Sequence, residues 1–363
     1  MNFSQETDAL IGVHEYPAVS IILPTHPQYP KFKVDKEHMI ELLRNAEAQL
    51  SARFSKHKTA GIMERLRTAV NEIDYTSLSS GLAIYVTEHV SKVIHLPFEV
   101  SEKVIVDDSF EIRDLIYSAK LNHQYLLVAI TKNGVRTALG YGNALVPIKY
   151  KDMPTNIHDV KNSHSLPGWD YLDTEAYDEK NLHNYLHFID ETVRKALTGL
   201  DIPVIVVADT KLLGYIRSEA TIAPRVIGYI EGNIEHASSA EIRKKVQPIL
   251  DRINQKEQEE AMLLLQHAVS KGSFAAGIVE AWRVVREGKA RLLLVEKDYR
   301  QTGVLGDDEF TFIPGEPSMA VHRQVADAVD DLIEWVIRHK GEVVFVPDGT
   351  LGDYQRIAIV NRY

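Results

Sequence analysis

No cysteine occurs among the 363 residues of the chain, so disulfide bonds, thiolate metal sites and cysteine nucleophiles are all excluded. No apolar run approaches the roughly eighteen residues that indicate a membrane-spanning helix. The first ten residues, MNFSQETDAL, have neither the basic region nor the apolar core of a secretory signal. These absences predict a cytoplasmic protein that does not bind membranes.

Several catalytic signatures are missing as well. The chain has no GxxxxGK[ST] phosphate-binding loop, no GxSxG nucleophile elbow and no HExxH zinc motif. Gly140-Tyr141-Gly142 is a GxG sequence in a strand-like context, but it lacks the third glycine and does not open a helix, as a dinucleotide site requires. We therefore expect no cofactor.

Acidic residues outnumber basic ones, 51 to 41, and the positive charge is unevenly distributed. The net charge of −10 disfavours indiscriminate binding to nucleic acid, DNA included. Residues 31–67 nevertheless carry nine lysines and arginines against five acidic residues. Two interpretations remain open for this segment: a solvated helix face, or a patch that binds the phosphates of RNA. The candidate RNA-binding residues in its denser part are Arg53, Lys56, Lys58, Arg65 and Arg67.

The apolar pattern predicts an α/β protein with three α/β domains, because a chain of this length exceeds one ordinary core. The first domain is expected at residues 1–120, with two amphipathic helices on either side of the basic segment SARFSKHKTAG. Its expected strands are 19–23, 81–86 and 90–97, and its expected helices are 36–50 and 62–73.

The middle domain is expected at residues 121–252. Lys132-Asn133-Gly134 predicts a hairpin, because Asn-Gly supplies the positive φ angles of a type I′ turn. Two antiparallel strands, a loop, a helix and a buried strand follow in the order of an RNase H-like domain. The expected strands are 125–130, 135–142 and 203–208, and the expected helices are 181–197 and 211–219.

The third domain is expected at residues 253–363, after a charged helix at 240–269 whose polar middle, NQKEQEE, suggests a boundary near residue 252. Alternating helices and single buried strands predict three layers. The expected helices are 276–288 and 319–339, and the expected strands are 290–295, 342–346 and 357–360.

A long loop, residues 147–180, shows neither a helical nor a strand period. Loops of this length are uncommon in compact domains and are usually functional or disordered. Its histidines, tryptophan and tyrosines favour function over a simple linker. The candidate functional residues are His164, Pro167, Gly168, Trp169 and Tyr171.

Metal chemistry has one weak candidate. His183 and His187 share a helix face at i, i+4, with Glu179 or Asp190 as a conceivable third ligand. Asn184 replaces the glutamate of the zinc-protease motif, so no general base is built in. Packing of the histidines against the long loop is the favoured alternative, and we expect no metal site.

An RNase H-like nuclease carries an acidic residue on its first strand to hold a divalent metal. No carboxylate lies between Leu121 and Gly142, so metal-dependent nuclease chemistry is disfavoured. Asp209 follows the strand at 203–208 and is expected to cap the next helix.

Sequence segments in all three domains resemble archaeal and eukaryotic class-one release factors and Pelota, and more closely the bacterial archaeo-eukaryotic release factor family. The first domain contributes VSIILP at 19–24 and GLAIYV at 81–86. The middle domain contributes YLLVAITKNGVRTALGYGN at 125–143 and EKNLHNYLHFIDETV at 179–193. The third contributes FAAGIVEAWRVVREGKARLLLVEKD at 274–298, which resembles a kink-turn-binding ribosomal-protein fold, and a closing segment at 341–363.

Two motifs that this resemblance implies are absent. Release factors carry Gly-Gly-Gln in the loop before the EK…HNY helix, whereas residues 147–180 contain neither a Gly-Gly pair nor a glutamine. The stop-codon-reading Asn-Ile-Lys-Ser is replaced by Phe54-Ser-Lys-His-Lys58. Basic side chains there can contact ribosomal RNA without reading a codon, because phosphate contacts position while base contacts specify.

The resemblance therefore implies a non-catalytic, ribosome-associated tRNA mimic that acts in ribosome hibernation or rescue. Its expected partners are ribosomal RNA and, by analogy, a translational GTPase. One alternative is a peptidyl-tRNA or RNA hydrolase that uses His158 or His164 beside Asp159 or Asp170. Another is a protein-interaction module of unknown role.

Overall fold

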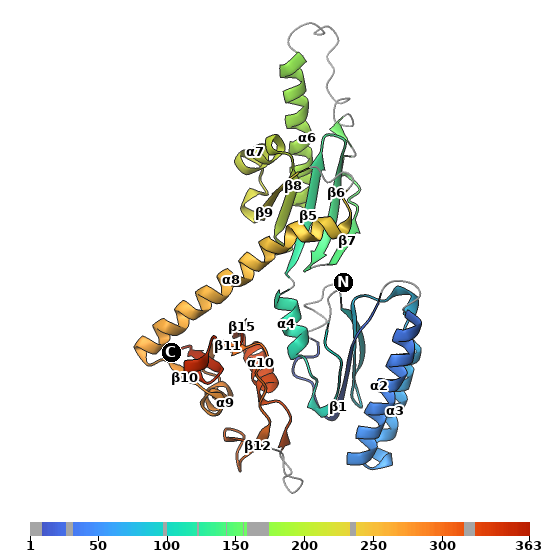
Figure 1. The fold of residues 1–363 in the computed structure, drawn as a ribbon, viewed down its shortest axis with the longest axis vertical. Helices are drawn as coiled ribbons and strands as arrows, with labels where there is room; N and C mark the ends of the chain where they lie inside the picture. Colours follow the sequence, from blue (N-terminus) through green and yellow to red (C-terminus); the bar gives the residue numbers. More distant parts are fainter. Residues whose placement is uncertain are drawn as a thin grey trace. The chain divides into compact units, whose positions relative to one another are not determined.

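The computed structural model describes residues 9–26, 32–96, 100–121, 123–142, 144–154, 156–157, 174–232, 237–315 and 324–363. The chain divides into two compact units: residues 1–120 with 254–363 form the first, and residues 121–253 form the second. Mixed sheets and helices occur in both (Figure 1), which confirms the predicted α/β class. Among the described residues, no helix has the length and apolar character needed to cross a bilayer.

The N-terminal part of the first unit is built on the antiparallel sheet β3-β2-β1-β4. Alternate residues of β1 point to opposite faces, as strand geometry requires: Val19, Ile21 and Leu23 pack under two helices, and Ala18 and Ile22 belong to the core on the other face. The strands are β1 (His14–Pro24), β2 (Gly81–Val86), β3 (Ser91–Leu96) and β4 (Lys103–Ser109), and the helices are α2 (Phe32–Arg53), α3 (Lys56–Asn71) and α4 (Arg113–Leu121).

The C-terminal part of this unit has the sheet β10-β16-β11-β15. Leu293 and Val295 face α9 and α10, whereas Leu292 and Leu294 face the second half of α8, so the part has the predicted three layers. A small sheet, β13-β12-β14, is inserted beside it. The helices are α9 (Ile278–Arg286) and α10 (Ala328–Arg338), and the strands are β10 (Phe274–Ala276), β11 (Ala290–Glu296), β12 (Gly303–Leu305), β13 (Phe312–Pro314), β14 (Gln324–Val325), β15 (Glu342–Val346) and β16 (Ile357–Asn361).

The second unit has the sheet β7-β6-β5-β8-β9, antiparallel among its first three strands and parallel from β5 to β9. Helices α6 and α7 cover one face, and the first half of α8 covers the other. The strands are β5 (Gln124–Thr131), β6 (Gly134–Tyr141), β7 (Ala144–Ile148), β8 (Val204–Ala208) and β9 (Val226–Glu231), and the helices are α6 (Thr174–Ala196), α7 (Thr210–Glu219) and α8 (Ser239–Lys271).

The structure corrects several predicted boundaries. The predicted loop 147–180 is shorter, because β7 takes in Pro147 and α6 begins at Thr174. The helix predicted at 319–339 begins only at Ala328. Gly134 pairs with Thr131 as the first residue of β6, so the hairpin is confirmed but its turn is formed by Lys132 and Asn133.

Candidate nucleic-acid interface

The basic segment predicted from the sequence lies where α2 ends and α3 begins. The Phe54 N–H donates to the Leu50 carbonyl at 2.9 Å, so the last turn of α2 extends into the connection. Ser55 is the N-cap of α3 in an extended conformation, and its side chain makes no capping hydrogen bond. This short connection brings Arg53, Lys56 and Lys58 together at one end of the helix pair.

An aromatic pair lies beside these cations. The rings of Tyr16 and Phe54 meet edge to face, with their centroids 4.9 Å apart. The Lys58 Nζ atom lies 5.4 Å from each ring centroid, close enough for a cation–π contact with both. Tyr16 is 54% exposed although it is held by Phe54. The connection therefore presents an exposed ring together with positive charge.

Arg53 forms a hydrogen bond within the protein. Its Nη1 donates to the Val106 carbonyl at 3.0 Å, which fixes the guanidinium next to the middle of β4. Burial, followed by the charge of Asp108, raises the pKa of the neighbouring Asp107 to about 6, and Arg53 acts in the opposite direction. Arginine has five N–H donors, so this contact leaves others for a ligand.

The remaining basic candidates do not join one cluster. At about 100° per residue, Lys56 and Arg67 lie on one flank of α3, and Lys58 and Arg65 lie near the opposite flank. The Arg67 Nε donates to Glu47 Oε1 at 2.7 Å, and this bond raises the pKa of Arg67. Lys56 and Arg65 are exposed and form no ion pair with any residue that the structure describes. Arg53, Lys56 and Lys58 share the connected end of the helix pair, whereas Arg65 and Arg67 lie about two to three turns further along α3.

The predicted functional loop falls largely outside the described residues. His158, His164, Pro167, Gly168, Trp169 and Tyr171 all belong to the segment between residues 157 and 174. The loop leaves the sheet through Tyr150 and Met153, which pack on the core of the second unit. It returns in α6, which begins at Thr174.

The weak metal candidates have other partners. His183 Nε2 lies 2.9 Å from Glu219 Oε2, and its ring meets Tyr215 edge to face. Asp190 accepts hydrogen bonds from the backbone N–H groups of Thr221 and Ile222, so it braces the end of α7. Within the described ranges, no three histidine, aspartate or glutamate side chains gather as a metal site.

Asp209 has the capping role predicted for it. Its Oδ1 accepts the Leu212 N–H at 2.9 Å at the start of α7.

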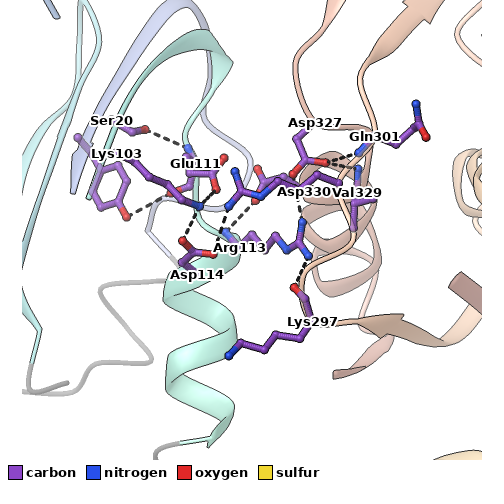
Figure 2. Close-up of polar contacts among 12 residues, drawn as sticks. Ser20, Lys103, Glu111, Arg113, Asp114, Lys297, Gln301, Asp327, Val329 and Asp330 are labelled. Carbon is purple, nitrogen blue, oxygen red and sulfur yellow. Dashed lines mark hydrogen bonds and ion pairs between the residues drawn. The ribbon is translucent and has the colours of Figure 1, made fainter. Parts of the chain in front are cut away.

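A second polar cluster, centred on Arg113 at the start of α4, lies within the first unit (Figure 2). Arg113 is 2% exposed. Its backbone N–H donates to Asp330 Oδ1 at 2.7 Å, and its guanidinium donates to Asp327 Oδ2 at 3.2 Å and to the Lys297 carbonyl at 2.6 Å. Burial, followed by the charge of Glu111, raises the pKa of Asp330 well above its usual range. This many partners fix a buried arginine as a structural link between α4 and α10.

Sequence analysis missed both Tyr16 and the Arg113 cluster. Tyr16 stands alone in a strand-like stretch before Pro17, and only the fold brings Phe54 and Lys58 beside it. The partners of Arg113 are some two hundred residues away in the chain, so no local spacing could have indicated them.

A comparison with solved structures found similar chains, among them archaeal and yeast proteins. A model of ribosome-bound archaeal Pelota and ABCE1 is 15% identical, covering 80% of this chain and 74% of that one, with a TM-score of 0.44. S. cerevisiae Dom34, a translation termination-like factor, is 12% identical over 78% of this chain and 73% of its own, with a TM-score of 0.38. The archaeal translation termination factor aRF1 is 13% identical over 99% and 97%, with a TM-score of 0.26.

A sequence comparison found a family model that matches part of the chain. The model of bacterial archaeo-eukaryotic release factor family 3 matches residues 124–289, from β5 to the end of α9 and just beyond. This match confirms, for that segment, the resemblance predicted from the sequence. No curated protein matches the chain.

Proposed function

We propose that this protein is a cytoplasmic, ribosome-associated factor of the release-factor type that binds the ribosome without hydrolysing peptidyl-tRNA, in hibernation or rescue. The observation that carries the proposal is the family match over residues 124–289. That segment includes the loop in which release factors carry Gly-Gly-Gln, and the loop has neither a Gly-Gly pair nor a glutamine. A factor of this type that lacks Gly-Gly-Gln can still bind the ribosome, and we propose that binding is its function.

The connection between α2 and α3 supports an RNA-binding role. Arg53, Lys56 and Lys58 are grouped there, although the whole chain carries a net charge of −10. Neutralisation of RNA phosphates releases counterions, so even a small local cluster contributes a salt-dependent attraction. Tyr16 adds a ring on which an exposed base can stack. Arg65 and Arg67 are peripheral to this interface in the proposal.

The loop residues His164, Pro167, Gly168, Trp169 and Tyr171 form the second part of the proposal. They reach toward the peptidyl-transferase centre, where Trp169 and Tyr171 stack on exposed bases. We keep the predicted division into domains at 1–120, 121–252 and 253–363. The proposed protein partner of the C-terminal domain is a translational GTPase. This last step is an analogy with the release-factor superfamily.

Co-sedimentation of the full chain with ribosomes from its own source tests the proposal. We expect the protein to migrate with ribosomal particles at low salt. Charge reversal at Arg53→Glu, Lys56→Glu and Lys58→Glu should release it and make the remaining binding less dependent on salt, because up to three phosphate contacts are lost.

The matched control is Lys244→Glu, Arg252→Glu and Lys271→Glu, which makes the same change in net charge at exposed positions of α8. We expect this control to stay with the particles. Equal release of both variants would reduce the effect to net charge and remove the α2–α3 connection from the interface. A wild-type protein that never leaves the top of the gradient would contradict the proposed function itself.

Incubation with peptidyl-tRNA, with and without ribosomes, separates binding from hydrolysis. The proposal predicts no turnover. Turnover that disappears in His164→Ala would instead establish the alternative, a hydrolase that uses a loop histidine as general base.

A further inference from the structure

A cavity of about 350 Å³ lies in the first unit beside the Arg113 cluster. Its volume falls in the range of small-molecule sites, about 300–1,000 Å³. Its walls come from the residues before β4, from the first turns of α4 and from the turn that follows β11. Polar and charged side chains from all three segments line it, so its lining suits a charged ligand.

Two cations of this cavity are poorly neutralised. The Lys297 Nζ atom lies 5.3 Å from the Tyr117 ring centroid and forms no ion pair with any carboxylate in the described part of the chain. In Figure 2 its side chain runs toward α4, away from Asp327 and Asp330. Arg300 is 48% exposed, and its guanidinium approaches Asp114 only to 3.8 Å.

Asp114 is already neutralised from the other side. Its second carboxylate oxygen contacts the Lys103 ammonium, which also bonds Glu111 Oε1 at 2.8 Å. Lys297 and Arg300 therefore remain available for an anion that enters the cavity. Phosphate suits them, because arginine binds it through paired N–H donors and lysine through a point charge.

The rest of the lining selects for more than a bare anion. Ser101 and Tyr117 offer hydroxyl groups, and Asp298 offers a carboxylate on the same turn as the two cations. A carboxylate repels phosphate but accepts hydrogen bonds from hydroxyl groups. The lining thus combines cations for a phosphate with an acceptor for neighbouring hydroxyls.

We propose that this cavity binds a small phosphorylated sugar, such as the ribose phosphate part of a nucleotide. The phosphate lies against Lys297 and Arg300, and the sugar hydroxyls donate to Asp298. Arg113 forms the wall and keeps its structural partners. This site is independent of the proposed RNA interface, since its side chains belong to α4, to the turn after β11 and to the residues before β4, and none belongs to the α2–α3 connection.

Isothermal titration of the full chain with ribose 5-phosphate, in a buffer without phosphate, tests the proposal. We expect saturable binding that also raises the thermal unfolding temperature, because a ligand that binds only the folded state stabilises it. Unphosphorylated ribose should not bind. If no saturable binding is seen up to roughly 1 mM ribose 5-phosphate, the proposal is overturned.

Variants assign the roles of the residues. Lys297→Gln and Arg300→Gln should each weaken binding about tenfold, since each removes a charge-assisted hydrogen bond. Lys289→Gln is the matched control, because this partly exposed lysine pairs with Glu287 outside the cavity, and it should bind like the wild type. Equal affinity of Lys297→Gln, Arg300→Gln and the control would refute the site.

Inorganic phosphate tests the sugar contact. The wild type should bind ribose 5-phosphate more tightly than inorganic phosphate. Asp298→Asn should reduce this difference, because it weakens binding of the sugar phosphate and removes the repulsion between Asp298 and inorganic phosphate. An unchanged preference in Asp298→Asn, or equal binding of sulfate and ribose 5-phosphate by the wild type, would overturn the proposed ligand class.

Discussion

At the scale of single residues, Tyr16 is the side chain whose exposure is hardest to explain by packing alone. Among the aromatic side chains that the structure describes, only Tyr16 and Tyr363 expose more than half of their surface. Tyr363 is the last residue, whereas Tyr16 is held in β1 and by the edge-to-face contact with Phe54. A ring held in this way loses little conformational entropy when it binds a partner.

Tyr16→Ala is therefore expected to weaken ribosome association by about 1–3 kcal/mol, the usual contribution of one stacked base. Tyr16→Phe should behave like the wild type, because the ring is retained. Binding measured by sedimentation over a range of ribosome concentrations checks this, with Tyr363→Ala as the control. Loss of binding in both Tyr16 variants would assign the effect to the hydroxyl group and not to stacking.

Asp107 gives a pH-dependent prediction at the same scale. Burial raises its pKa to about 6 in the folded protein, so the unfolded chain releases the proton first as the pH rises from about 4 to about 6. Folding stability should fall across this interval, because ionisation costs more in the folded state.

Asp107→Asn should remove this loss and stabilise the protein at pH 7 by about 1–2 kcal/mol, allowing for partial exposure of the side chain. The difference should vanish below pH of about 4, where the wild-type carboxyl group is protonated in both states. Asparagine keeps an oxygen that can accept the Asp108 N–H. Chemical denaturation at several pH values measures the effect; a stabilisation independent of pH would contradict the assigned cause.

At the scale of helices and strands, long periodic elements were predicted well from the sequence. The strand predicted at 81–86 is β2 to the residue, and the apolar spacing in 36–50 and 62–73 predicted α2 and α3. Elements with little periodicity were missed, among them the three-residue strands β12 and β13 and the nine-residue α4. Their stability comes from tertiary contacts, which local patterns do not contain.

Helix α8 carries a polar stretch where the chain passes from one unit to the other. Its first half packs Ile242 and Val246 on the second unit, and its second half packs Ala261 and Leu265 on the first. The polar middle, NQKEQEE, contributes no buried core residue because the division between the units falls there, inside one continuous helix. The sequence predicted both a helix over 240–269 and a boundary near residue 252, and the structure has one continuous helix across the division between the units.

The contact of α4 with α10 leads to a prediction about whole elements. Arg113→Met should destabilise the first unit by about 3–5 kcal/mol, because it leaves buried carboxylates such as Asp327 without their partner. Trp282 and Trp335 both belong to this unit, so tryptophan fluorescence during chemical denaturation follows its unfolding. A loss below about 1 kcal/mol, the usual value of an exposed pair, would contradict the structural role assigned to Arg113.

At the scale of the whole molecule, the candidate site could be predicted only in part. Charge density along residues 31–67 indicated the α2–α3 connection, but it could not separate Lys58 from Arg67, whose directions depend on the helix face. The contacts of His183 could not be predicted from the sequence either, because its partners Glu219 and Tyr215 lie in a different helix, α7. The family match, in contrast, depends on the order of segments along the chain and was visible in it.

A cryo-EM reconstruction of the full chain bound to its own ribosome tests the central claim most directly. The account predicts density in which Arg53, Lys56 and Lys58 lie within hydrogen-bonding distance of ribosomal RNA phosphates. It also predicts that the peptidyl-transferase centre is empty or holds intact peptidyl-tRNA. A map in which the α2–α3 connection faces solvent while the protein binds the ribosome through another surface would contradict it.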